Sequence, residues 1–144
     1  MAVRTAFAEW EGTLQEGKGT VRLGSGAFEG GFNWASRFDD APLTNPEELL
    51  GAAHAGCFSM SLGSALGRAG HPATRISTTA RVHLTKTESG FSITRIDLET
   101  EGIVPGIEEE AFQQFAHNAK SGCIVSRALS AVEITVEARL LPAP

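Results

Sequence analysis

The chain has 144 residues, 42% of them hydrophobic, with a formal net charge of −5 and a sequence pI of about 5.3. These values are typical of a single globular domain over residues 1–144, and the acidic balance makes nucleic acid and anionic membranes poor partners. We find no apolar run long enough to cross a membrane and no signal-peptide core near the N-terminus, which predicts a cytoplasmic protein without a membrane partner.

The first 40 residues predict three β-strands separated by turns that contain glycine. The strands are expected at residues 5–11, around Val21 and Leu23, and at residues 27–38. The third candidate is interrupted by two glycines and ends in the segment SRF, where Arg37 has an aromatic neighbour.

The longest helical pattern in the chain lies at residues 44–70. Asn45 is the preferred N-cap, because Pro46 then takes the first helical position and Glu48 completes a capping signature. A cap at Thr44, with Glu47 in the second role, is the alternative register.

One face of this helix combines polar and apolar side chains, while most flanking positions are Gly, Ala or Ser. Because Gly and Ser are poor helix formers, packing must hold the helix, which predicts a central and buried position. The residues that share this face are Leu50, His54, Cys57 and Ser61.

The second half of the chain predicts a long hairpin followed by two helices and a closing strand. A shift in the apolar phase between Ile93 and Ile96 indicates a β-bulge in the return strand. With strands and helices segregated along the chain, the fold class is expected to be α+β. The expected elements are strands at 74–87 and 91–101, helices at 107–120 and 123–129, and a strand at 131–141.

The two cysteines, Cys57 and Cys123, lie far apart in the sequence and form no CxxC motif. In a reducing compartment they are either buried packing residues or partners in redox chemistry. Helix dipoles alone favour Cys123 as the nucleophile, because it precedes a short helix. Cys57 lies deep within its helix, so its thiolate would need a nearby cation.

Other polar residues have ordinary structural interpretations. Arg37 is interpreted as a surface residue paired with the acidic pair 39–40, and Glu47 as a solvated residue of a first helical turn. The remaining histidines and cysteines show no spacing typical of metal ligands, so no metal is expected.

Several segments together resemble the OsmC/Ohr family of thiol-dependent hydroperoxide reductases. The most specific are NPEELLGAAHAGCFSM and the later KSGCIVS, supported by WEGTLQEGKGTV, SRF and ITRIDLETEGIVPGIEEEAF. The resemblance covers essentially the whole chain and is closer to the OsmC branch, because the arginine falls in the SRF segment. It implies an intertwined homodimer of α+β fold, with antiparallel sheets wrapped around central helices.

The resemblance also implies the roles of four residues. Cys57 matches the reactive cysteine and Cys123 the resolving cysteine, and Ile124 replaces the usual Pro. Arg37 and Glu47 match the family's arginine and glutamate, which implies that Arg37 stabilises the Cys57 thiolate and that Glu47 holds the guanidinium in a charge-assisted pair. In the implied reaction the Cys57 thiolate reduces an organic hydroperoxide, and hydrogen peroxide less well. A disulfide with Cys123 follows, and an external dithiol, for which a lipoyl-type reductant is a candidate, reduces it without another cofactor.

Helix geometry adds a prediction about assembly. Glu47 and Cys57 lie about 15 Å apart along one helix, so antiparallel helices in a symmetric dimer would bring Glu47 to the partner chain's cysteine. Apolar residues expected near the site, Phe58, Leu50, Phe38 and Met60, would favour organic peroxides. The alternatives are a non-catalytic protein that binds a small apolar ligand and a redox sensor with the same fold.

Overall fold

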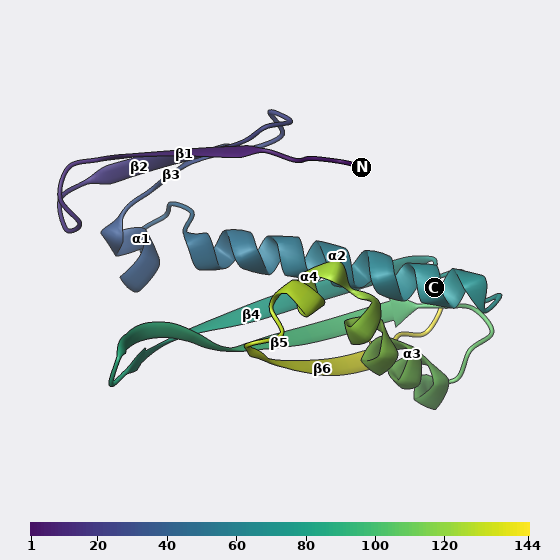
Figure 1. The fold of residues 1–144 in the computed structure, drawn as a ribbon. Coiled ribbons are helices and arrows are strands. Elements are labelled where there is room, and N and C mark those ends of the chain that lie inside the picture. The colour runs from purple at the N-terminus through teal and green to yellow at the C-terminus, as the bar shows by residue number, and fades with distance from the viewer. The chain divides into compact units, whose positions relative to one another are not determined.

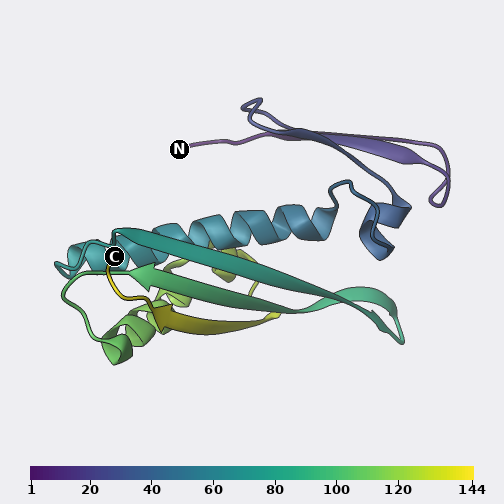
Figure 2. The same cartoon turned by 180° about the vertical axis from the view of Figure 1, so that it is seen from behind.

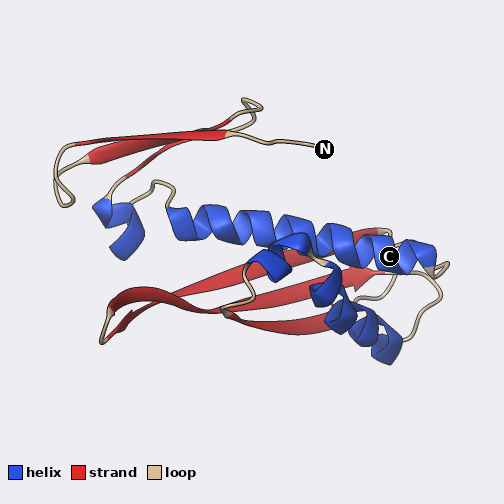
Figure 3. Ribbon diagram, viewed as in Figure 1, coloured by secondary structure: helices blue, strands red, loops and turns tan.

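The structure is a computed structural model that describes residues 1–144. The chain forms two compact units, Met1–Leu49 and Leu50–Pro144 (Figure 1). Ten helices and strands make up the chain, and Figure 3 separates the two kinds by colour. That the two units form one domain stays a prediction.

The first unit contains a three-stranded antiparallel sheet in the order β1-β2-β3. Its strands are β1 (Ala6–Glu11), β2 (Lys18–Leu23) and β3 (Glu29–Phe32). The prediction of a strand through residue 38 is wrong in its second half, which is a short helix, α1 (Trp34–Phe38). Asn33 begins it through a capping box: its side chain accepts from the Ser36 N–H at 2.7 Å, and the Ser36 hydroxyl accepts from the Asn33 N–H at 3.0 Å.

The long helix α2 (Pro46–Arg68) starts in the preferred register, because the Asn45 side chain accepts from the Glu48 N–H at 2.8 Å. The Glu48 carboxylate accepts from the Thr44 hydroxyl at 2.8 Å, a contact that the capping signature did not predict. The Asn45 amide also donates to the Ser36 carbonyl at 2.9 Å, which links the start of α2 to α1.

By length and composition alone, α2 could cross a membrane, contrary to the expectation from sequence that no run is long enough. Its small and apolar residues give it that hydropathy. One such helix is weak evidence for a membrane segment. Only 28% of this apolar stretch is buried, so the expectation of a buried helix is wrong for one side of α2.

The second unit is built on the strands β4 (Arg75–Thr87), β5 (Gly90–Ile103) and β6 (Glu133–Leu140). β4 and β5 form the predicted hairpin, and the predicted bulge is confirmed, because His83 pairs with Arg95 and Leu84 with Ile93. The expectation of antiparallel sheets is confirmed for β1–β3 and for β4 with β5, but it is wrong for β6, which lies parallel to β5. The helices α3 (Glu109–Gly122) and α4 (Ile124–Ala128) form the connection that a parallel pairing requires.

The core of this unit lies between the sheet and its helices. Figures 1 and 2 show α3 and α4 on one side of β4–β6, and the buried side chains of α2 join the same core. Gly102 leaves room for this packing, because a Cβ there would lie 2.5 Å from the Phe112 ring. The buried apolar residues include Phe58, Leu62, Leu66, Ile96, Leu98, Phe112, Ala116 and Ala119.

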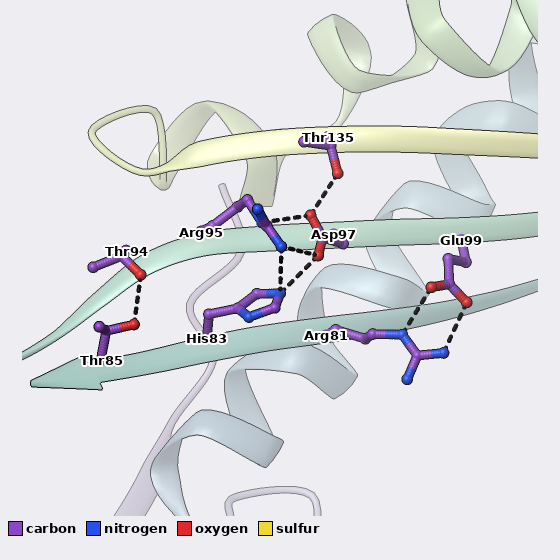
Figure 4. Close-up of polar contacts among 8 residues, drawn as sticks. All are labelled: Arg81, His83, Thr85, Thr94, Arg95, Asp97, Glu99 and Thr135. Carbon is purple, nitrogen blue, oxygen red and sulfur yellow. Dashed lines mark hydrogen bonds and ion pairs between the residues drawn. The ribbon is translucent and has the colours of Figure 1, made fainter.

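The other face of the sheet is polar, and its side chains bind one another (Figure 4). Asp97 lies at the centre, where it accepts from Thr135 at 2.7 Å and lies 2.6 Å from His83 and 2.9 Å from Arg95. The hydrogen bonds from Thr135 and His83, with the charge of Arg95, lower the pKa of Asp97 to about 2 against the opposing effect of desolvation. Alternate residues on one strand thus point to two faces of the sheet, an apolar face covered by helices and a polar face.

Candidate functional site

The two cysteines meet where α2 lies against the start of α4. Cys57, on α2, is half-buried and packs against the core, while Cys123 is fully buried and caps the N-terminus of α4. Both thiols are free, and the Cys123 side chain is a hydrogen-bond partner of Cys57. Residues that are distant in sequence therefore form one pair of reduced sulfurs.

The surroundings of Cys57 favour its thiolate. Burial by itself raises the pKa of the Cys57 thiol, but the backbone N–H groups of Val125 and Ile124, the Cys123 side chain and the charge of Arg127 together lower it below the ordinary value. The N–H groups at the start of α4 thus reach Cys57, whereas the dipole argument from sequence assigned them to Cys123 alone. That argument did not foresee a contact between two helices.

Cys123 is held by its own short helix and by the helix before it. Its sulfur accepts a hydrogen bond from the Ser126 N–H at 3.3 Å, and its backbone N–H donates to the Ala119 carbonyl at 2.9 Å. These two bonds fix the turn between α3 and α4. The sulfur therefore occupies a defined position beside Cys57.

A second pair, Arg37 and Glu47, lies in the first unit. The guanidinium donates to the Glu47 carboxylate through Nε at 3.0 Å and through one terminal nitrogen at 2.6 Å. Glu47 is only 7% exposed, while the Arg37 side chain is 41% exposed and lies over the Phe38 ring. The interpretations of Arg37 as a partner of residues 39–40 and of Glu47 as a solvated residue are therefore wrong.

The four residues singled out in the sequence thus form two pairs, one in each unit. α1 carries Arg37 and the first turn of α2 carries Glu47, while the middle of α2 and the start of α4 carry the cysteines. A contact between Arg37 and Cys57 stays a prediction.

Two other expectations about the site change. Phe58 is fully buried in the core, so its ring packs inside the unit instead of lining an accessible surface, whereas Met60 is 78% exposed. The sequence also assigned no role to His54, whose imidazole lies 2.7 Å from the Ser126 hydroxyl. Its position three residues before Cys57 was the only signal in the sequence, and the partner on α4 could not be read from it.

No group of three or more His, Cys, Asp or Glu side chains in the chain could hold a metal ion.

Comparison with known proteins shows to which family this chain is similar. A family model of OsmC-like proteins matches residues 39–138. The chain is 50% identical over 136 residues to the peroxiredoxin OsmC of Escherichia coli (strain K12), covering 92% of this chain and 93% of that protein. The same values hold for the peroxiredoxin OsmC of Shigella flexneri.

The chain belongs to the OsmC family. The resemblance inferred from the sequence motifs is thereby confirmed, and solved structures support the fold. An organic hydroperoxide resistance protein OsmC from Legionella pneumophila has a TM-score of 0.77 at 22% identity, covering 96% of this chain and 99% of that chain. OhrB of Bacillus subtilis, an organic hydroperoxide resistance protein, has a TM-score of 0.71 at 23% identity, and the match covers 95% of this chain and 98% of that chain.

Proposed function

We propose that this OsmC family member reduces organic hydroperoxides, and hydrogen peroxide less well, through Cys57 and Cys123. The relatives from Escherichia coli and Shigella flexneri are peroxiredoxins, and their identity to this chain supports a hydroperoxide-reducing activity. The observation that carries the residue assignment is the contact between two free thiols, one of which has a lowered pKa. A lowered pKa supplies the thiolate that attacks a peroxide.

The reaction has three steps. The Cys57 thiolate attacks one peroxide oxygen, the O–O bond breaks, and the alkoxide leaves as an alcohol after taking a proton, so that Cys57 becomes a sulfenic acid. The Cys123 sulfur then displaces the sulfenic hydroxyl, which leaves as water with the thiol proton, and a disulfide forms. An external dithiol, with a lipoyl-type compound as the candidate, restores both thiols by exchange in the reducing cytoplasm.

Arg37 would stabilise the reacting thiolate in this scheme, and Glu47 would orient the guanidinium. Support comes from the two-point pairing of these side chains, which fixes the plane of the guanidinium while leaving the Arg37 side chain partly exposed. Since about 15 Å of helix separates Glu47 from Cys57, the pair would act on the cysteine of a second chain in a symmetric dimer.

The exposed side of α2 is suited to such a dimer. Small or apolar residues follow one another at helical spacing along it, which would allow another helix to approach closely. A large exposed side chain, Met60, lies in the middle of this surface. The exposed positions are Ala52, Ala53, Gly56, Met60, Ser64 and Gly67.

The decisive experiment is non-reducing mass spectrometry of the intact chain after one equivalent of cumene hydroperoxide. The proposal predicts a loss of two hydrogens per chain and recovery on addition of dihydrolipoamide. Cys123→Ser should still consume about one equivalent of peroxide, and Cys57→Ser none. An unchanged mass in the wild-type chain would instead favour a non-catalytic, ligand-binding protein.

A further inference from the structure

His54 is a buried titratable residue for which the proposed reaction has no use. It is completely buried on α2, and burial lowers its pKa, which favours the neutral imidazole. One ring nitrogen, Nε2, lies 2.7 Å from the Ser126 hydroxyl, whereas Nδ1 has no hydrogen-bond partner. Burying an imidazole with an unpaired nitrogen is unfavourable for stability, so packing alone does not explain this residue.

The hydrogen bond of His54 connects the two segments that carry the sulfurs. His54 precedes Cys57 by three residues, so both side chains lie on one face of α2. Ser126 follows Cys123 by three residues on α4 and is also buried. This is a side-chain bond between α2 and α4 close to the thiols.

Ser126 also contacts the second sulfur directly. Its hydroxyl binds the imidazole, and its backbone N–H donates to the Cys123 sulfur at 3.3 Å. A continuous chain of hydrogen bonds therefore runs from His54 through Ser126 to Cys123. The helix α4 has only five residues, and this side-chain bond adds to the backbone N–H groups of Ile124 and Val125 that reach Cys57.

We propose that His54 is a positioning residue for disulfide closure. By holding Ser126, it keeps the start of α4 and the Cys123 sulfur within reach of Cys57 when the sulfenic acid forms. In the closing step the sulfenic sulfur is reduced, the Cys123 sulfur is oxidised, and the thiol proton leaves with the sulfenic hydroxyl as water. This inference rests on the proposed function and assigns to it a residue that contacts no substrate.

The test compares two rates in each variant: formation of the sulfenic acid and its loss by disulfide closure. Rapid quenching with dimedone after cumene hydroperoxide measures both by intact mass. Ser126→Ala should slow closure about tenfold, the effect of losing one favourable hydrogen bond of about 1.4 kcal/mol, and dimedone adducts should accumulate. His54→Leu should act alike, while His54→Gln, which keeps a polar group near Nε2, should remain within about threefold of the wild type.

Ser59→Ala is the matched control, because Ser59 also forms a hydrogen bond from α2, to the Thr78 hydroxyl on β4 at 2.8 Å, away from the segment that holds Cys123. It should lower the melting temperature about as much as Ser126→Ala and leave the closure rate unchanged. Closure within about twofold of the wild type in Ser126→Ala, or equal slowing in Ser59→Ala, would overturn the inference. A wild-type chain that forms no disulfide at all would overturn the proposed function instead.

Discussion

The two faces of the β4–β6 sheet use polar residues in opposite ways. One face is not covered by α3 and α4 and is called the open face here. On it, Asp97 is surrounded by Thr135, His83 and Arg95, and Arg81 pairs with Glu99 (Figure 4). On the helix-covered side the polar groups near the sulfurs are few and buried, and one ring nitrogen of His54 is unpaired. Exposed polar clusters satisfy one another and water at little cost, whereas a buried incomplete cluster lowers stability and calls for another explanation.

The largest expected difference between the two faces concerns peroxide consumption. Cys57→Ser should lower the rate at least on the order of 1000-fold, because a hydroxyl is hardly ionised at neutral pH and is a poor nucleophile. Asp97→Asn, on the open face, should leave the rate within about twofold. Loss of cumene hydroperoxide measured by an iron–xylenol orange assay checks both. An equal loss of peroxide consumption in the two variants would contradict the different roles assigned to the two faces.

A second test concerns the exposed surface of α2, which is apolar where the open face of the sheet is polar. Met60→Lys places a charge at the proposed dimer contact, and it should shift a dimer to the monomer at micromolar concentration. Thr79→Lys, on the open face of β4, is the control and should not change the assembly. Sedimentation velocity distinguishes the two species. A wild-type chain that sediments as a monomer contradicts the predicted assembly.

The third test separates two roles of Cys123. The hydrogen bond from this residue helps to lower the pKa of Cys57, so Cys123→Ala should reduce the thiolate fraction at pH 6 about tenfold, the value of one hydrogen bond to a charged group. Cys123→Ser keeps a donor and should resemble the wild type. Because Cys57 is the only cysteine in both variants, the rate of alkylation by iodoacetamide against pH reports it directly. Identical pH profiles would remove Cys123 from the stabilisation of the thiolate.

The smallest expected effect lies on the open face. The pKa of Asp97 is lowered to about 2 in the folded chain, so its ionised form stabilises the fold above the ordinary carboxyl range. That contribution is lost as the pH falls through about 4 towards 2. Asp97→Asn should therefore reduce the urea midpoint slightly at pH 6 and remove part of its decrease in acid. A wild-type midpoint that does not change from pH 6 to pH 3 would contradict this.

Much of the fold follows from local patterns that the sequence displays. The alternation at residues 74–87 and the phase shift between Ile93 and Ile96 predicted the hairpin and its bulge, since both depend on residues close in the chain. The Asn45 cap was predicted for the same reason. The helix α1 was missed because its aromatic residues, Trp34 and Phe38, were interpreted as the end of the strand at 27–38, although Asn33 and Ser36 carry a capping box.

The sequence by itself determined the family, the α+β class and the identity of the two cysteines, because motif spacing and hydrophobic periodicity are properties of the chain. The pairing of Arg37 with Glu47, which the family resemblance implied, is confirmed. Only the tertiary structure decided that β6 lies parallel to β5 and that the first N–H groups of α4 reach Cys57. It also placed His54 against Ser126. Each of these is a contact between separate elements, and hydrogen bonds and charges act over a few ångströms that only folding can bring about.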